Sequence, residues 1–178
     1  FEPYKIFFLP ISRFTKKVPE ETGKTFSENA VIKAKHAGEL INWKFPCLAD
    51  DSGLSIEVLS NQPGVYSARW AIENNYSEAF KLINYKIMEK GETMEGQPAF
   101  FNCTLALMQS PFKVNTFEGI LKGSLTYPPR GSFGFGYDPI FIPHDNNKTL
   151  AQLNRNEKNQ ISHRKLAIKK LIEFLFEK

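Results

Sequence analysis

Two adjacent aspartates, Asp50 and Asp51, stand directly after a short apolar run and are followed by Ser52 and Gly53. Carboxylate oxygens are the ligands that a hard cation such as Mg²⁺ prefers, and ligands of open α/β sheets tend to bind beyond the carboxyl ends of strands. Because side chains alternate across a strand, only one of the two aspartates is expected to face a binding cleft. The same residues are also typical of an ordinary junction between a strand and a turn, and that interpretation stays open.

A second pair of carboxylates, Glu20 and Glu21, precedes a segment that carries Lys33. An acidic loop can supply a further metal ligand, and a lysine on the polar face of a helix can neutralise a phosphate group. Glutamates and lysines around the start of a helix are equally typical of solvated surface charge, so this pattern is weak by itself.

Glycines alternate with aromatic residues in the segment 130–139, RGSFGFGYDP. Glycine lets the backbone approach a ligand closely, and the rings of Phe133, Phe135 and Tyr137 offer flat faces on which a base could stack. Asp138 adds a hydrogen-bond acceptor. The segment is not a dinucleotide-binding fingerprint, because the glycine pattern is incomplete and no helical pattern follows it. A purely structural turn is the alternative.

Two cationic or titratable side chains, His163 and Arg164, follow Ser162, which can cap the last helix. Cations in the first turn of a helix oppose its macrodipole, so their presence there indicates a bound anion or electron-rich group nearby. Lys158, one short helical piece earlier, could join them. A different helix boundary would remove this argument.

The elements that must position these residues alternate between strand and helix. Thr25 and Glu28 form a capping-box pattern before an amphipathic helix that runs to Ile41, and its polar face carries Lys33. A second helix is predicted from Ser77, and a third, in two pieces meeting near Ser162, from 152 to 178. Strands are predicted at 5–11, 45–49, 54–58, 99–108, 113–125 and 139–142. This order predicts the α/β class, with part of the sheet antiparallel.

The composition is that of a globular protein, with 178 residues, of which 42% are hydrophobic, and a net charge of +4. It predicts one compact domain over residues 1–178. No run of like charges suggests a nucleic-acid tail, and no apolar run approaches the roughly 20 residues that cross a bilayer. Cys47 and Cys103 lack the spacing of zinc or redox sites and are expected to be buried thiols. We therefore expect a cytoplasmic protein with neither nucleic-acid nor membrane partners.

The four groups occur in order within VPEETGKTFSENAVIKAKHA, ADDSGLSIEVLSNQPGVYSARWA, FGFGYDPIF and NEKNQISHRKLA. In this combination the chain resembles the inosine/xanthosine triphosphate pyrophosphatase (Ham1-like) family from about Val18 to Phe174. The resemblance implies a mixed twisted sheet with flanking helices, in two lobes around a central cleft, and a homodimer. It also implies a Mg²⁺-dependent attack of water on the α-phosphorus of ITP, dITP or XTP, which yields the nucleoside monophosphate and pyrophosphate.

The resemblance also assigns residue roles, motif by motif. Asp51 matches the proton acceptor and a metal ligand, and Glu20 matches the second metal position. The substrate-binding positions are matched by Lys33, Ser52, Phe135, Gly136, Tyr137, Asp138, Lys158, His163 and Arg164. The last two can donate hydrogen bonds to an oxygen at the 6-position of the purine, whereas the amino group of adenine would leave those donors unpaired.

Two departures from the family pattern leave alternatives open. Nothing before Phe8 matches the family's first strand and its Gly/Asn/Lys phosphate loop, so upstream residues are expected to be missing. Gln152 stands where the family usually has glutamate. The alternatives are a nucleotide-binding protein that no longer catalyses, and a pyrophosphatase for a pyrimidine or modified nucleotide, against which His163 and Arg164 argue.

Overall fold

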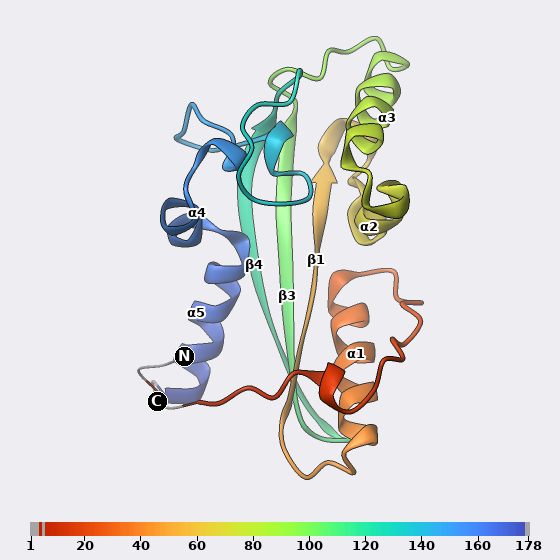
Figure 1. Cartoon of the computed structure of the whole chain (residues 1–178), viewed down its shortest axis with the longest axis vertical. Helices are drawn as coiled ribbons and strands as arrows, with labels where there is room; N and C mark the ends of the chain where they lie inside the picture. The colour runs from red at the N-terminus through yellow and green to blue at the C-terminus, as the bar shows by residue number, and fades with distance from the viewer. Residues whose placement is uncertain (1–3, 5, 177–178) are drawn as a thin grey trace.

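A five-stranded sheet forms the centre of the computed structural model, which describes Tyr4 and residues 6–176. The strands lie in the order β2-β1-β3-β4-β5, and every neighbouring pair is antiparallel. The three long strands run side by side through the molecule (Figure 1). The strand bounds are β1 (Cys47–Ile56), β2 (Gln62–Pro63), β3 (Pro98–Ser110), β4 (Lys113–Leu125) and β5 (Phe141–Pro143).

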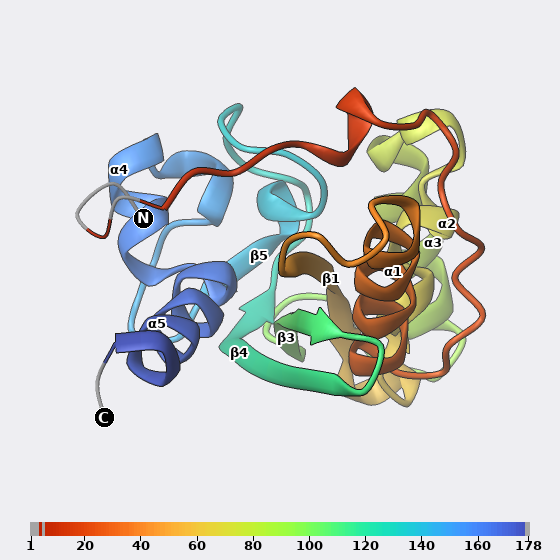
Figure 2. The same cartoon turned by 90° about the horizontal axis from the view of Figure 1, so that it is seen from below.

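Helices flank the sheet on both sides, as Figures 1 and 2 show. The α-helices are α1 (Phe26–Leu40), α2 (Ser67–Trp70), α3 (Tyr76–Met88), α4 (Arg155–Ile161) and α5 (His163–Phe176). Short 3₁₀ turns are η2 (Ile11–Arg13), η3 (Glu57–Leu59), η4 (Gly64–Tyr66), η5 (Ile72–Asn74), η6 (Asp138–Ile140) and η7 (Leu150–Gln152). No described helix is long and apolar enough to span a membrane.

The two faces of the long strands are covered by different helices. On one face, Ala30 and Ala34 of α1 pack against Ala106 and Met108 of β3. On the other face, Ala167 and Leu171 of α5 belong to a cluster with side chains of β3 and β4. Because side chains alternate along a strand, neighbouring residues of β1 are divided between these two helices.

A third and larger apolar cluster lies toward the other end of the strands. It contains Leu54 and Ile56 of β1, Phe80 and Ile83 of α3, and Phe141 of β5. The core is therefore divided along the strands, and residues 50–53 of β1 lie between its parts.

The predicted helix boundaries are largely confirmed. The backbone N–H of Glu28 donates to Thr25 Oγ1 over 3.1 Å and the Glu28 carboxylate accepts in return, which is the predicted capping box. Ser162 separates α4 from α5 with extended dihedral angles, and its hydroxyl accepts the backbone N–H of Lys165 over 3.2 Å. The cap of α3 is Asn75, however, and not Ser77.

Three strand predictions are corrected. Residues 6–10 form no strand, because none of the described strands pairs with them, and Phe7 is 91% exposed; Lys5 lies outside the described residues. The strands expected at 45–49 and 54–58 are one strand, because β3 pairs with it continuously from Cys47 to Ile56. The strand expected at 139–142 begins only at Phe141, since η6 precedes it. The mixed α/β class is confirmed, with an antiparallel sheet throughout the described part of the chain.

Candidate active site

Asp50 and Asp51 lie on opposite faces of β1. Asp51 contacts Lys33 of α1, whereas Asp50 contacts Arg164 of α5. The two carboxylates alternate across the strand as expected, and which of them faces a ligand stays a prediction; both lie within a strand and not in a turn after one. The candidate site therefore consists of two groups of residues, one on each face of β1.

The group on the α1 face is centred on Lys33. Its ammonium contacts Asp51 Oδ1 over 2.6 Å and Glu21 Oε1 over 3.0 Å. Burial opposes the charge on Lys33, but the two carboxylates outweigh it and raise the lysine pKa. Burial raises the pKa of Asp51, and the nearby charge of Glu21 adds to this effect. Asp51 is thus a buried carboxylate that is more basic than an ordinary aspartate.

The acidic loop before α1 is held by two hydrogen bonds. The Gly23 N–H donates to Asn29 Oδ1 over 2.8 Å, and the Arg69 guanidinium donates to the Glu21 carbonyl over 2.8 Å. Glu20 is exposed, and within the described chain it is Glu21, not Glu20, that approaches Lys33. The loop geometry thus points the second of the two glutamates toward Asp51.

Arg69 is not among the predicted site residues, although it lies within the segment PGVYSAR, which is part of the family resemblance. The same segment supplies Ser67, whose hydroxyl accepts the Leu54 N–H over 2.9 Å. A Cβ on Gly53 would stand 2.5 Å from both Ser67 Oγ and the Gly64 carbonyl. Glycine at position 53 therefore lets this segment pack directly against β1.

The group on the α5 face lines a pocket of about 700 Å³, a size suited to a small organic ligand. Its walls include Phe133, Phe135, Lys158, His163 and Arg164. The ring of Phe135 is 66% exposed, and the ammonium of Lys158 lies 4.2 Å from its centre. The pocket therefore combines an accessible aromatic face with cationic donors.

Asp138 fixes the loop that carries Phe135. Its carboxylate accepts the Phe135 N–H over 2.7 Å and pairs with the Lys158 ammonium. Gly134 has a φ of +80°, and a Cβ there would collide with the Asp138 carboxylate. Asp138 is itself 2% exposed, so it orients Lys158 and the loop from within the fold.

Tyr137 turns away from this pocket. Its ring is 3% exposed and belongs to the large apolar cluster, and its hydroxyl donates to the Ser67 carbonyl over 2.8 Å. The expectation that this ring offers a face to a base is wrong, because the rings of Phe133 and Phe135 line the pocket whereas the ring of Tyr137 is buried in the apolar cluster. Any contact of Tyr137 with a ligand must come from its backbone.

His163 is the most deeply buried titratable group of the pocket. Its ring stacks on Phe101 with 4.9 Å between the ring centres, and its Nδ1 is buried without a hydrogen-bond partner among the described residues. Burial, reinforced by the positive charges of Arg164 and Lys158, lowers its pKa to about 4. The imidazole is therefore neutral near pH 7, with one nitrogen as donor and the other as acceptor.

Arg164 and Ser52 meet at Asp50. The guanidinium contacts the Asp50 carboxylate over 2.8 Å, and the Ser52 hydroxyl donates to the same carboxylate over 3.1 Å. Burial opposes ionisation of Asp50, but Arg164 and the neighbouring donors outweigh it and lower the aspartate pKa. The pKa of Asp50 is therefore shifted in the opposite direction to that of Asp51.

The residues of the α1 face fit a Mg²⁺ ion that also binds substrate oxygens. Asp51 Oδ2 is buried without a hydrogen-bond partner in the described part of the chain, although Oδ1 is paired. The described residues contain no cluster of three or more His, Cys, Asp or Glu side chains arranged around a metal position. Mg²⁺ usually takes one or two carboxylates and completes its shell with water and phosphate oxygens, so two carboxylates suffice.

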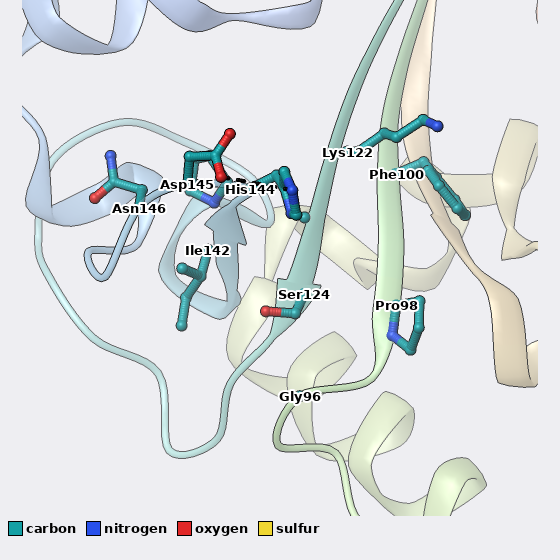
Figure 3. A pocket seen from close by; sticks show the side chains of 11 residues that line it. Gly96, Pro98, Phe100, Lys122, Ser124, Ile142, His144, Asp145 and Asn146 are labelled. Atoms are coloured by element: carbon teal, nitrogen blue, oxygen red, sulfur yellow. Dashed lines mark ion pairs between the residues drawn. The ribbon is translucent and has the colours of Figure 1, made fainter.

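A second hollow, of about 370 Å³, lies beside β4 and β5 and contains none of the predicted site residues. Figure 3 shows His144 and Asp145 close together at its rim, with Lys122 on the neighbouring strand. The side chains of His144 and Asp145 are 80% and 90% exposed, so neither has the buried environment found around Asp51 and His163.

The sequence profile of the Ham1 family matches residues 4–174. A dITP/XTP pyrophosphatase of Bacillus subtilis is 47% identical over 163 residues, which cover 91% of this chain and 80% of that protein. One of Coxiella burnetii is 41% identical over 177 residues, covering 97% and 86%.

Solved structures agree with these relatives. The structure of a HAM1 protein from Coxiella burnetii superposes with a TM-score of 0.89 at 39% identity, covering 98% of this chain and 88% of that one. The Staphylococcus aureus Ham1 protein superposes with a TM-score of 0.81 at 37% identity, covering 90% and 81%.

Proposed function

The chain belongs to the Ham1 family, and on that premise we propose that it hydrolyses the non-standard purine nucleotides dITP, XTP and ITP to monophosphate and pyrophosphate. Relatives named dITP/XTP pyrophosphatase support this reaction. The structural observation that supports this reaction is that β1 divides the site into two groups of residues. A buried carboxylate and a lysine lie on one face, and an aromatic, cationic pocket lies on the other.

The triphosphate binds on the α1 face and the purine on the α5 face. Beyond Ser55 and Ile56, which pair with β2, the outer edge of β1 carries no strand among the described residues. A nucleotide can therefore pass along this edge, beside Ser52, and reach both groups. Lys33 neutralises phosphate charge at one end of this path, and Lys158 contacts the nucleotide near the other.

Asp51 orients and deprotonates the attacking water. The water oxygen bonds to the α-phosphorus, the bond from that phosphorus to the bridging oxygen breaks, and pyrophosphate leaves. The raised pKa of Asp51 favours proton acceptance. Charge that develops on the phosphate oxygens is stabilised by Lys33 in a partly buried position, where electrostatic interactions are stronger than in water.

Asp51 and a carboxylate of the pair Glu20 and Glu21 would hold Mg²⁺. The unpartnered Asp51 Oδ2 and the position of Glu21 beside Lys33 support this proposal. When bound, the ion supplies neutralisation of the triphosphate and a lower pKa for the attacking water.

The base lies against Phe135 and is read by His163 and Arg164. Neutral His163 and charged Arg164 can both donate to an oxygen at the 6-position of hypoxanthine or xanthine. The amino group of adenine would leave these donors facing another donor, at a cost of about 1–3 kcal/mol for each unsatisfied group. Ser52, Gly136, Asp138 and the backbone of Tyr137 complete the substrate-binding set.

The reaction is tested with a panel of nucleotides. Purified protein is incubated with Mg²⁺ and dITP, XTP, ITP, GTP, ATP or CTP, and pyrophosphate and orthophosphate are measured separately. We expect pyrophosphate mainly from dITP, XTP and ITP, and little without Mg²⁺. Orthophosphate as the product, turnover mainly of CTP, or tight binding without turnover would each overturn the proposal.

The role of Asp51 is tested by Asp51→Asn, which keeps the shape of the side chain and removes its charge. We expect kcat to fall at least about a hundredfold, the range for loss of a general base. Asp145→Asn is the matched control, because Asp145 is exposed and lines the separate hollow beside β4 and β5. Near-normal kcat for the Asp51 variant would remove this residue from its role.

A further inference from the structure

Asp50 is a hydrogen-bond acceptor for three different elements. Its Oδ2 accepts the Ser52 hydroxyl of β1 over 3.1 Å, the Cys103 thiol of β3 over 3.2 Å and the Arg164 Nε–H of α5 over 2.8 Å. Its Oδ1 accepts a second Arg164 donor, Nη2, over 3.3 Å. Asp50 is one of the two adjacent carboxylates that the sequence singles out, but neither the family resemblance nor the proposed chemistry gives it a role.

The contact between Asp50 and Arg164 fixes the plane of the guanidinium. An arginine paired through both Nε and Nη2 cannot rotate without losing a bond, because its donors form a rigid fork. Among the described residues, the Arg164 side chain makes no hydrogen bond other than these two, so its Nη1 donors have no protein partner. Arg164 lines the pocket of the α5 face, where those donors are available to a ligand.

The same pair contributes little to the stability of the fold. The side chains of Arg164 and Asp50 are 40% and 34% exposed, and ion pairs of such exposure stabilise proteins only weakly. Arg164 also lies in the first turn of α5, where a cation opposes the helix macrodipole. The negative charge of Asp50 offsets this unfavourable interaction and holds the Arg164 side chain at the pocket.

We propose that Asp50 is a positioning residue for nucleotide binding, which holds Arg164 and Ser52 in the orientation that the base and sugar-phosphate require. The inference rests on the proposed function of the same site. A preoriented arginine loses less conformational freedom on binding than a mobile one, so its effect falls on affinity. Asp50 touches neither water nor phosphorus in the reaction, and it acts through its two partners.

The test is steady-state kinetics of Asp50→Asn with dITP, beside Asp145→Asn as the exposed control. We expect KM to rise on the order of tenfold while kcat changes by less than about threefold, because the lost interaction contributes to binding in both ground and transition states. A residue that only fastened α5 to β1 would lower the melting temperature and the active fraction and leave KM unchanged.

A double-mutant cycle tests whether Asp50 affects KM through Arg164 or independently of it. In the background of Arg164→Gln, the additional change Asp50→Asn should raise KM by less than about twofold. The proposal would be overturned if KM of the double variant rose by the product of the fold-increases measured for the two single variants.

Arg164→Lys gives a test that does not depend on the folding of the Asp50 variant. Lysine keeps the positive charge but cannot form the two-bond contact with Asp50. We expect its KM for dITP to approach that of Arg164→Gln, and a wild-type KM would show that charge without orientation is sufficient. Failure of the wild-type protein to cleave dITP and XTP would instead overturn the proposed function, so the two failures are distinguishable.

Discussion

Two chemically identical neighbours, Asp50 and Asp51, receive different properties from the sides of β1 on which they lie. Asp51 is buried beside the like charge of Glu21, and its pKa is raised. Asp50 is surrounded by Arg164, Ser52 and the Cys103 thiol, and its pKa is lowered. One carboxylate is thereby suited to proton acceptance and the other to permanent charge, which matches the roles that we propose.

His163 gives a pH dependence that can be measured. Its pKa is lowered to about 4 by burial and by Arg164 and Lys158, whereas an unfolded histidine titrates near 6.5. Above about pH 6.5 the ring is neutral in both states. As the pH falls from about 6.5 toward about 4, His163 binds a proton in the unfolded chain but not in the folded protein. Folding stability therefore decreases by about 1–3 kcal/mol.

The measurement is the melting temperature of wild type and His163→Gln from about pH 7.5 to about pH 4.5. The variant should lose part of the acid destabilisation, although its stability at neutral pH is reduced by the lost stacking on Phe101. His144→Gln is the control, because His144 is exposed and lies outside the pocket of the α5 face. Equal profiles for wild type and the His163 variant would contradict the lowered pKa.

Helix α5 positions His163 and Arg164 through close packing on β4. A Cβ on Gly119 would collide with the His163 carbonyl and would stand 2.5 Å from the backbone nitrogen of Ala167. The obstacle is backbone and not a flexible side chain. The glycine in the middle of β4 therefore sets how near the first turn of α5 lies to the sheet, and with it the position of the two side chains that we propose to contact the base.

Gly119→Ala should consequently impair both stability and substrate binding. We expect a loss of about 1–3 kcal/mol in folding stability, as for other overpacked sites, together with an increased KM for dITP, because His163 and Arg164 shift with α5. Gly96→Ala is the control. Gly96 has a φ of +81° with open space around it and lies away from the site, so its replacement strains the backbone without moving α5.

Urea unfolding measures the loss of folding stability, and KM for dITP, measured on the folded variants, reports substrate binding. The Gly96 variant should lose about 1–2 kcal/mol and keep the wild-type KM. An unchanged KM for Gly119→Ala would show that α5 adjusts without disturbing the pocket.

The whole molecule exposes several large apolar side chains. Phe7, Phe112 and Val18 are 91%, 98% and 79% exposed. Exposed aromatic side chains are often buried on assembly, because association removes their apolar area from water. The family resemblance implies a homodimer, and we propose that the protein is a homodimer in solution.

Sedimentation equilibrium tests this assembly. We expect a mass of twice the 20.4 kDa of one chain. Measurements over a range of protein concentrations should give a reversible equilibrium, with the fraction of dimer increasing with concentration. A constant mass of one chain at every concentration would contradict the proposal.

The sequence by itself determined the family and the reaction class, and it supplied the candidate residues of the site. The segments ADDSG, GFGYDP and SHR are short, so their residues are recognisable without knowledge of their contacts. Local patterns also predicted α1 with its capping box, the division of the last helix at Ser162 and the strands β3 and β4, because caps and hydrophobic periodicity depend on neighbouring residues.

Only the tertiary structure decided which of these residues meet. The pairing of Asp50 with Arg164 joins positions 114 residues apart, and the choice of Glu21 beside Lys33 depends on how Arg69 holds the acidic loop. The burial of Tyr137 likewise depends on the cluster around it. The physical reason is that the face on which a strand residue lies is set by its register with a distant partner, and a shift of one residue would exchange Asp50 and Asp51.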